Sequence, residues 1–339
     1  MFNIEKTKLE INETLLANPL YKRIIVQFPD GLLDNFANQV YDFLFEKNIE
    51  CIIAGDPSYG ACDLPTLQAS IFDVDAIFHF GHSTFAFPPP NIGIPICYFS
   101  VEAQVEINWE LIIKELQNLQ WKTIGIVTTI QHTTIVEKSK PIFKSNGLNS
   151  IIFKEGQILG CNQNRADKIA KEVDGFLVIA GGNFHASPIV VSTGKSTLRY
   201  DPFNHGFQLF DESYRKTYLQ KRFAVITKAK EAKNWGVLLS LKSGQLPKDK
   251  GKKTINLLQK NGKKAIAIPM FRIDPQHLFN FYNIDAWVIN LCPRIATDDF
   301  ISFNKPIVTA RELLVVLGLL DWETFVNPVS NEQLLIIEE

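Results

Sequence analysis

Short continuous runs of apolar residues alternate along this chain with longer stretches in which apolar positions recur every three or four residues. In the first hundred residues the apolar runs lie at 24–28, 51–54, 76–80 and 94–99, and a stretch with helical periodicity, 32–46, follows the first run. Continuous apolar strands that alternate with helices indicate a parallel sheet covered on both faces. The pattern therefore predicts an α/β fold.

The same order of patterns returns twice more along the chain. Further strands are expected at 124–128, 151–153, 176–179, 198–200, 235–240, 265–269, 286–290 and 307–309, and helices at 108–119, 133–146, 165–172 and 212–233. This repeat and the handedness rule for parallel crossovers predict three homologous small domains, each a doubly wound parallel sheet, around a central site. We place the domains at 1–105, 106–210 and 211–339, the last beginning with the long linking helix.

Polar and glycine-bearing segments follow the predicted strands at matching places in all three domains. They lie at 27–31, 55–63, 79–83, 128–132, 156–162, 181–185, 240–245 and 290–294. Ligands of doubly wound sheets bind at the carboxyl ends of the strands, and glycine there lets the backbone approach a ligand closely. Eight such loops predict a site to which every domain contributes.

The cysteines fall into two groups. Cys51 and Cys97 lie inside apolar runs, where cysteine is an ordinary core residue. Cys62, Cys161 and Cys292 each lie in a loop with glycine or proline, one per predicted domain. Thiolates on loops are the usual ligands of iron–sulfur clusters, but no Cys-x-x-Cys motif is present. Spacing alone therefore leaves both a metal site and incidental thiols open.

Composition narrows the class of protein. The chain has 339 residues, 46% of them hydrophobic and 21% charged, and its formal net charge is −1. These values are typical of a soluble globular protein and predict no affinity for nucleic acid or membranes, and the basic run at 248–253 is interpreted as a solvated loop. No window approaches the roughly 18 apolar residues of a membrane-spanning helix, and residues 1–10 are too polar for a signal peptide. We therefore expect a cytoplasmic protein with reduced thiols.

Motifs of several common enzyme classes are missing. His82, His132 and His185 lie in the predicted site loops and His205 lies near them, but none has a serine or cysteine partner at the spacing of a hydrolase triad. His79 is expected to be structural or at the surface, as is His277. There is no GxGxxG after the first strand and no P-loop. The sequence therefore has no motif that would support a nicotinamide dehydrogenase or an NTPase.

Taken in order, the loop segments resemble a known enzyme family. The matching segments are QFPDGLL (27–33), GDPSYGAC (55–62), HFGHS (79–83), TTIQH (128–132), GQILGCN (156–162), GGNFH (181–185), DPF (201–203), KSGQ (242–245) and CPRIATDD (292–299). Together they are similar to the radical enzymes of diphthamide synthesis, the 2-(3-amino-3-carboxypropyl)histidine synthases. Ser240 and Leu241 depart from the Gly-Thr pair that is commoner in that family.

The resemblance implies that Cys62, Cys161 and Cys292 hold one [4Fe-4S] cluster and leave one iron open. S-adenosylmethionine would bind there, and the reduced cluster would cleave its S–Cγ bond and release methylthioadenosine. The 3-amino-3-carboxypropyl group would pass to C2 of a histidine in translation elongation factor 2, the first step of diphthamide synthesis. An electron donor is implied, and the chain length is similar to that of the archaeal, homodimeric members.

Other site residues are assigned less specifically by the resemblance. Arg294 is expected to have one of two roles. It either offsets the charge of the cluster or binds the substrate carboxylate, or instead it forms a salt bridge with Asp298 or Asp299. Expected polar or backbone contacts to S-adenosylmethionine are Gln27, His82, Gly181, Gly182, His185, Lys242 and Gln245. A quinolinate synthase-like [4Fe-4S] enzyme is one alternative, although its Cys-His-Ser-Tyr-Tyr run is absent, and a non-catalytic ligand-binding protein is another.

Overall fold

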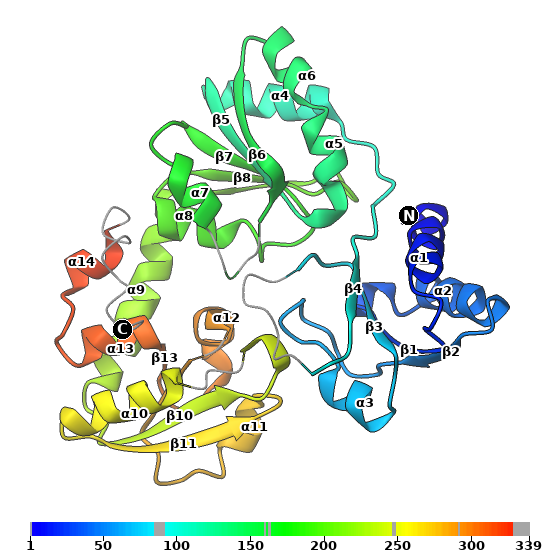
Figure 1. Cartoon of the computed structure of the whole chain (residues 1–339). Coiled ribbons are helices and arrows are strands. Elements are labelled where there is room, and N and C mark those ends of the chain that lie inside the picture. Colours follow the sequence, from blue (N-terminus) through cyan, green and yellow to red (C-terminus); the bar gives the residue numbers. More distant parts are fainter. Residues whose placement is uncertain are drawn as a thin grey trace.

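Three α/β units surround a common centre (Figure 1). This computed structural model describes residues 2–84, 92–158, 161, 164–245, 249–290 and 292–327. Each unit is built on its own sheet, two of them with four strands and one with five. The expected fold class, three small sheets that are mostly parallel, is confirmed.

The first unit is a parallel sheet in the order β2-β1-β3-β4. Its elements are α1 (Ile4–Ala17), β1 (Arg23–Gln27), η1 (Asp30–Leu32), α2 (Asn35–Glu46), β2 (Glu50–Ile53), α3 (Thr66–Ile71), β3 (Ala76–Phe80) and β4 (Ile96–Phe99). The helices α1 and α2 pack over one face of the sheet, and α3 packs over the other through Ala69. The pattern predicted no helix at α1, and α2 begins three residues late because the Asp34 side chain caps it.

The second unit has the order β6-β5-β7-β8-β9. Its elements are α4 (Trp109–Asn118), β5 (Thr123–Thr128), η2 (Ile130–His132), α5 (Thr133–Glu137), α6 (Lys140–Ser145), β6 (Asn149–Gln157), α7 (Asn164–Ile169), β7 (Gly175–Ile179), α8 (Ser187–Thr193), β8 (Thr197–Tyr200) and β9 (Phe207–Phe210). The unpredicted β9 pairs antiparallel with β8, so this sheet is not wholly parallel. The single helix expected at 133–146 is two, because Pro141 near the start of α6 favours a new helix.

The third unit is parallel, in the order β11-β10-β12-β13. Its elements are β10 (Asn234–Ser240), η3 (Ser243–Gln245), α10 (Lys250–Lys260), β11 (Lys264–Met270), α11 (Pro275–Leu278), β12 (Ala286–Ile289), α12 (Pro293–Thr297), η4 (Phe300–Ser302), β13 (Ile307–Thr309), α13 (Ala310–Val316) and α14 (Trp322–Val326). Its core lies on both faces of the sheet, with Trp235 on one and Trp287 on the other.

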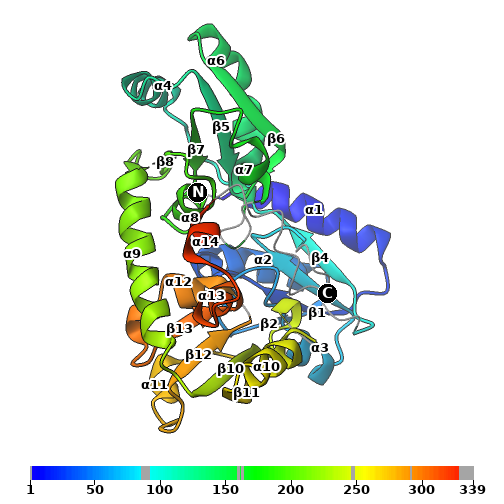
Figure 2. The same ribbon diagram turned by 90° about the vertical axis from the view of Figure 1, so that its left-hand side faces the viewer.

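A long helix, α9 (Glu212–Ala229), joins the second unit to the third (Figure 2). Arg222 on this helix is almost fully buried, and its guanidinium binds both carboxylate oxygens of Glu312 at 2.7 Å. The same guanidinium donates to the carbonyl oxygens of Ala296 and Ile307 at 2.6 and 3.0 Å. These bonds fix α9 against α12, β13 and α13, and so fix the linker to the unit that carries Cys292.

The three units share a clamp at the start of their first strands. Asp75, Asp174 and Asp285 directly precede the third strand of their unit, and each carboxylate accepts two successive backbone N–H groups at 2.6–3.0 Å. These backbone N–H groups lie at the starts of β1, β5 and β10, and they lower the pKa of each carboxyl. The same bond at the same place in all three sheets supports the internal repeat.

Candidate active site

The loops after β2 and β10 are in direct contact, which joins the first unit to the third. Gly244 N–H donates to the carbonyl oxygen of Cys62 at 2.9 Å, and Leu64 N–H donates to Ser243 Oγ at 3.0 Å. A Cβ on Gly244 would lie 2.6 Å from the Cys62 Cα, so only glycine fits this approach. Gln245 Nε2 donates to Cys62 Sγ at 3.2 Å. The loop that carries Cys62 is therefore held by the end of a strand from another unit.

A second contact joins the first unit to the second. Gln131, which follows β5, donates from Nε2 to the carbonyl oxygen of Gly81 at 2.6 Å. Gly81 follows β3 and has a φ of +79°, a conformation that favours glycine. The carboxyl ends of strands from different units therefore meet, as the strand-end loops predicted.

The three loop cysteines are half-buried and interact with one another electrostatically. Burial, together with a smaller effect of the neighbouring Cys292 and Cys62, raises the pKa of the Cys161 thiol to about 11. Burial also raises the pKa of the Cys292 and Cys62 thiols, and Cys62 adds to the effect on Cys292. All three thiols are thus protonated at neutral pH, and binding a metal would release their protons.

The potential metal ligands of the site are three thiols, one from each unit. Within the described part of the chain, no three His, Cys, Asp or Glu side chains lie close enough to hold one metal ion. A four-iron cluster is larger than a single ion, so its ligand sulfurs stand further apart. The Cys292 sulfur accepts a hydrogen bond from the backbone N–H of Arg294, and this bond lowers the pKa of Cys292. The side chain of Gln245 likewise donates a hydrogen bond to Cys62 and lowers its pKa. Thiols from three units with N–H donors beside them fit a cluster better than a single ion.

Arg294 lies next to two of these thiols. Its guanidinium forms an ion pair with Asp298, so the pairing expected from sequence is present. It also stacks on the ring of Phe184, with 4.2 Å between the guanidinium carbon and the ring centroid. Its charge lowers the pKa of the Cys161 and Cys292 thiols, while its Nε is buried without a partner among the described residues. Arg294 therefore retains a donor for a ligand.

A hydrogen-bonded chain runs from the Cys62 loop to His82. Gln27 Nε2 donates to the carbonyl oxygen of Asp63 at 2.7 Å, and its Oε1 lies 2.8 Å from His79 Nδ1. His79 Nε2 lies 3.0 Å from His82 Nδ1. Burial lowers the pKa of His79 to about 3 and that of His82 to about 4, so both rings are neutral at pH 7. His79, expected to be structural, is buried within this chain.

Lys242 also engages the Cys62 loop. Its ammonium forms an ion pair with the Asp63 carboxylate and lies 4.6 Å from the centroid of the Tyr59 ring. Gln27, Lys242 and Gln245 thus all hold the loop around Cys62. Their contact with a small-molecule ligand stays a prediction.

The second unit contributes His185. Burial, together with a smaller effect of the nearby Arg294 and His82, lowers the pKa of His185 to about 4. Its Nδ1 is buried without a partner among the described residues. Gly181 and Gly182, just before it, are exposed, and Gly182 has a φ of +69°. Backbone contacts from these two glycines to a ligand stay a prediction.

The remaining histidines have other surroundings. His132 is buried against the ring of Phe203, and burial lowers its pKa to about 4. His205 is hydrogen-bonded to the hydroxyl of Tyr200, and His277 is exposed on α11. Cys51 and Cys97 pack against the core of the first unit, as the sequence predicted.

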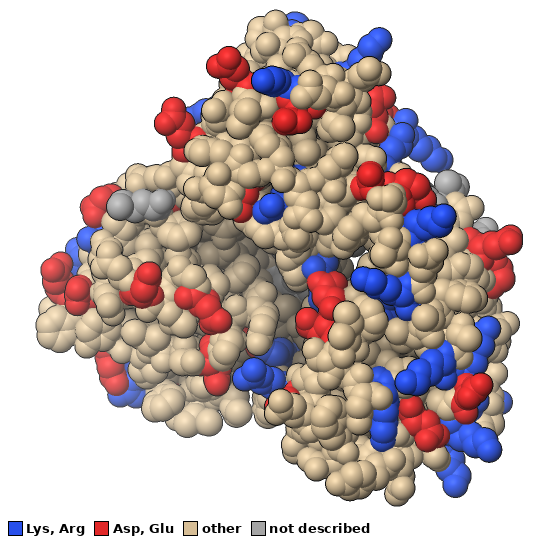
Figure 3. Space-filling view, turned by 180° about the vertical axis from the view of Figure 1, so that it is seen from behind, with Lys and Arg blue, Asp and Glu red and all other residues tan. Residues whose placement is uncertain are grey.

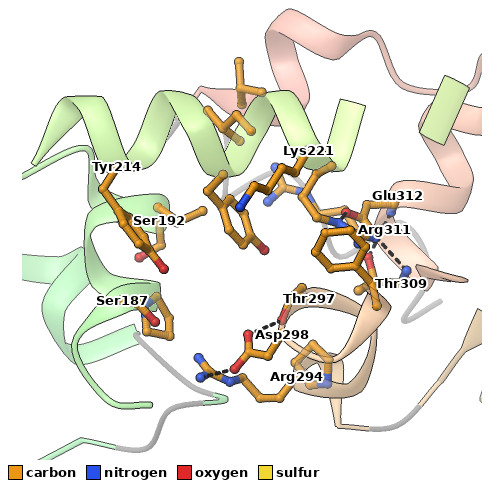
Figure 4. A pocket seen from close by; sticks show the side chains of 18 of the residues that line it. Ser187, Ser192, Tyr214, Lys221, Arg294, Thr297, Asp298, Thr309, Arg311 and Glu312 are labelled. Atoms are coloured by element: carbon orange, nitrogen blue, oxygen red, sulfur yellow. Dashed lines mark hydrogen bonds and ion pairs between the residues drawn. The ribbon is translucent and has the colours of Figure 1, made fainter. Parts of the chain in front are cut away.

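A pocket of about 630 Å³ opens beside Cys161 and Arg294 (Figure 4). Its walls are α8 and α9 on one side and α12, α13 and α14 on the other, so it lies between the second and third units. Tyr214, Tyr218 and Lys221 reach it from one face of α9. Sequence reasoning missed these residues, because it treated the predicted helix at 212–233 as a link between the second and third units.

The fold and the site define a class of protein with three related α/β units that each bring one thiol to a shared centre. The family model described as "Putative diphthamide synthesis protein" matches residues 28–326, and the chain belongs to that family. The resemblance drawn from the loop segments is confirmed, and the quinolinate synthase-like alternative is not favoured.

Similar proteins carry a consistent name. The chain is 34% identical to the 2-(3-amino-3-carboxypropyl)histidine synthase of Pyrococcus horikoshii, over 88% of this chain and 86% of that protein. It is 30% identical to the Methanocaldococcus jannaschii protein of the same name, over 94% and 90%. The crystal structure of Dph2 from Pyrococcus horikoshii with a 4Fe-4S cluster matches with a TM-score of 0.80 and 32% identity, covering 93% of this chain and 91% of that one.

Proposed function

We propose that this chain is a 2-(3-amino-3-carboxypropyl)histidine synthase. It transfers the 3-amino-3-carboxypropyl group of S-adenosylmethionine to C2 of a histidine in translation elongation factor 2, the first step of diphthamide synthesis. The observation that supports this most is the meeting of Cys62, Cys161 and Cys292, one from each unit, at a shared centre. It occurs in a chain 34% identical to a synthase of that name.

In this proposal the three thiolates hold a [4Fe-4S] cluster. When bound, such a cluster with one iron free of protein ligands supplies the electron that cleaves the S–Cγ bond of S-adenosylmethionine. The residues around the thiols stabilise their anionic form, since Gln245 donates an N–H to Cys62 and Arg294 lowers the pKa of Cys161 and Cys292. Arg294 also has a free buried donor at Nε that fits the methionyl carboxylate.

The pocket beside Cys161 is the proposed site of S-adenosylmethionine. Its volume of about 630 Å³ lies within the range of small-molecule sites. It reaches Cys161 and Arg294 at one end, and tyrosine and phenylalanine rings from both units line it. A ligand there would have its carboxylate near the guanidinium and its sulfonium near the thiols. Bond choice then follows orientation, because geometry selects among S–C bonds of similar strength.

The partners follow from the same proposal. Elongation factor 2 is the protein substrate, and a cellular reductant supplies electrons. The active form is proposed to be a cytoplasmic homodimer. The face shown in Figure 3 is hollowed between its lobes, and acidic and basic side chains are interspersed over it. This face therefore has no patch of purely basic side chains of the kind that binds nucleic acid. No helix among the described residues is long and apolar enough to span a bilayer.

One anaerobic experiment tests the function. The protein is reconstituted with iron and sulfide, reduced with dithionite, and incubated with S-adenosylmethionine with and without elongation factor 2. We expect methylthioadenosine as the nucleoside product and a mass gain on elongation factor 2 equal to the aminocarboxypropyl group. A dominant 5′-deoxyadenosine peak, or methylthioadenosine without any transfer, would contradict the proposal.

A further inference from the structure

Two oppositely charged side chains lie side by side in the wall that α12 contributes to the pocket beside Cys161. Arg294 and Asp298 both line this pocket and form an ion pair across one turn of α12 (Figure 4). The Arg294 side chain is 11% exposed and that of Asp298 is 35% exposed, so the carboxylate is open to the pocket. The other cationic side chains labelled in Figure 4, Lys221 and Arg311, line the pocket from α9 and α13.

The Asp298 carboxylate is held in place through both of its oxygens. Oδ2 pairs with the Arg294 guanidinium, and Oδ1 accepts a hydrogen bond from Thr297 Oγ1 at 3.0 Å. Thr297 is itself hydrogen-bonded to Tyr218 on α9. An ionised carboxylate has about four lone-pair sites, so each oxygen can accept one more hydrogen bond. Asp298 is therefore a fixed acceptor that still has capacity for a ligand.

Helix stability does not explain the ion pair. Asp298 is the C-cap residue of α12, and Asp299 follows it. A carboxylate at the carboxyl end of a helix is unfavourable because the helix dipole is negative there. The pair also runs in the less favourable order, with the cation one turn before the anion. A carboxylate placed against the preference of its helix indicates a use outside the helix.

The charge of Asp298 acts on the thiol end of the site. Burial raises the pKa of the Cys292 thiol, and Asp298 adds to this effect while Arg294 opposes it. Burial likewise raises the pKa of Asp299, again with Asp298 adding and Arg294 opposing. Two carboxylates and a thiol thus share one guanidinium. Conversion of the thiol to a thiolate would leave an excess of negative charge, which a cationic group of a ligand would offset.

An α-amino acid group fits this pair better than a simple anion or a simple cation. Its carboxylate and its ammonium are attached to one carbon, so a neighbouring arginine and aspartate can bind both at once. An anion alone would be repelled by Asp298, and a cation alone would be repelled by Arg294. Arg294 Nε is a buried donor without a partner among the described residues. S-adenosylmethionine, the proposed ligand of this pocket, ends in such a group.

We infer that Asp298 binds the α-ammonium group of S-adenosylmethionine while Arg294 binds its carboxylate. This inference rests on the proposed function and names the residue that recognises the amino group of the transferred fragment. With both charged groups held by side chains one helical turn apart, the S–Cγ bond has one position relative to the thiols. Asp298 would thereby restrict the site to donors with an intact amino acid group.

The test is a cycle between one side chain and one group of the ligand. Asp298→Asn keeps the shape of the side chain and removes its charge. S-adenosylhomocysteine has the whole amino acid group, its deamino analogue lacks only the ammonium, and methylthioadenosine lacks the entire group. Calorimetry measures the dissociation constants of these ligands and of S-adenosylmethionine for the anaerobic holoenzyme without reductant. Asp42→Asn, at an exposed position on α2, is the matched control.

The expected result is a loss that depends on the ammonium. The unmodified enzyme should bind S-adenosylhomocysteine about fivefold to twentyfold more tightly than the deamino analogue. Asp298→Asn should lose most of this difference, while its affinity for methylthioadenosine should stay unchanged. Asp42→Asn should match the unmodified enzyme with every ligand. Because S-adenosylhomocysteine has no sulfonium, its loss of affinity reports the ammonium and not the charge on sulfur.

Four outcomes would overturn the inference. The unmodified enzyme could show no preference for S-adenosylhomocysteine over the deamino analogue. Equal weakening of both in Asp298→Asn would show that Asp298 acts only through Arg294. A loss confined to S-adenosylmethionine would assign Asp298 to the sulfonium, and weaker binding of methylthioadenosine would show a general change of the pocket. Failure of the proposed function is a separate result, because it would be an absence of transfer to elongation factor 2 by an enzyme that still prefers the ammonium.

Discussion

Gln245 Nε2 donates a hydrogen bond to Cys62 Sγ across the boundary between the third and first units, at 3.2 Å. The donor follows β10 and the sulfur belongs to the loop after β2. A residue from one unit therefore changes the pKa of a thiol in another unit. An N–H donor stabilises a thiolate more than a thiol, and accordingly Gln245 lowers the pKa of Cys62 against the effect of burial. This contact makes Cys62 dependent on the packing of two units.

Replacing Gln245 with leucine should make a bound cluster harder to reduce. Loss of the N–H donor removes a hydrogen bond to a ligand sulfur, and such bonds raise the reduction potential. From the usual energy of one hydrogen bond, the midpoint should move to more negative values by roughly 20–60 mV. A redox titration monitored by electron paramagnetic resonance measures this, with Gln259→Leu on the exposed face of α10 as the control. An unchanged midpoint would mean that the bond is absent in the loaded enzyme.

Gly244→Ala should separate the loops that meet at Cys62. The added Cβ would lie 2.6 Å from the Cys62 Cα, a backbone atom that cannot rotate away. We expect a loss of stability of about 1–3 kcal/mol and lower iron content after reconstitution. The matched control is Gly31→Ala, because nothing lies within 4 Å of a Cβ built there. Equal melting temperatures and equal iron content for both variants would contradict this view of the contact.

The five cysteines should divide into two groups when each is changed to alanine. Cys62, Cys161 and Cys292 should lose most of the bound iron and all transfer. Cys51 and Cys97, which pack against the core of the first unit, should keep iron and activity and lose about 1–2 kcal/mol of stability. Iron analysis and chemical denaturation measure these effects. Full cluster content in all three loop variants would refute the ligand assignment.

Glu312→Gln should be among the most destabilising single changes in the chain. It leaves the Arg222 guanidinium buried, with 1% exposure, without its counter-charge. Removing one partner of a buried pair typically costs about 3–5 kcal/mol. Glu212→Gln is the control, since its carboxylate is 70% exposed in the pair with Arg215 and should contribute less than about 0.5 kcal/mol. Urea denaturation of both variants decides the question.

The strands and the strand-end loops could be predicted because continuous apolar runs are a strong local signal. Helix α1 was missed because its apolar positions form a weak stripe, and only Thr7 and Ile11 of it are buried. Strand β9 was missed because it is short and half-exposed at a sheet edge, where alternation is hard to distinguish from a loop. Long-range pairs such as Gln245 with Cys62 leave no periodic pattern, and neither do the walls of the pocket beside Cys161.

The resemblance predicted the candidate site as a set of loops, and the contacts of each residue within it come from the structure alone. Gln27 and Lys242 were expected to contact a ligand. In the structure both contact Asp63 in the Cys62 loop, Gln27 by a hydrogen bond and Lys242 by an ion pair. His79 was expected to be structural or at the surface, and it is the buried link that orients His82. Tautomers and hydrogen-bond directions depend on side chains far apart in sequence, so residue types alone could not give them.

The pH dependence of stability should contain a measurable contribution from His132. Burial lowers its pKa in the folded protein to about 4, below the usual value of about 6.5 in an unfolded chain. Between these two values the unfolded chain binds more protons, so the contribution is present above about pH 6.5 and is lost as pH falls toward about 4. For this buried side chain the loss reaches roughly 3 kcal/mol.

His132→Gln cannot take up a proton, so the decline of its unfolding free energy from pH 6.5 to 4 should be shallower by up to that amount. His277→Gln, at an exposed position on α11, should follow the unmodified protein. Urea denaturation of the metal-free proteins at several pH values measures both slopes without interference from acid loss of iron, and identical slopes for His132→Gln and the unmodified protein would show that His132 is not held neutral by burial.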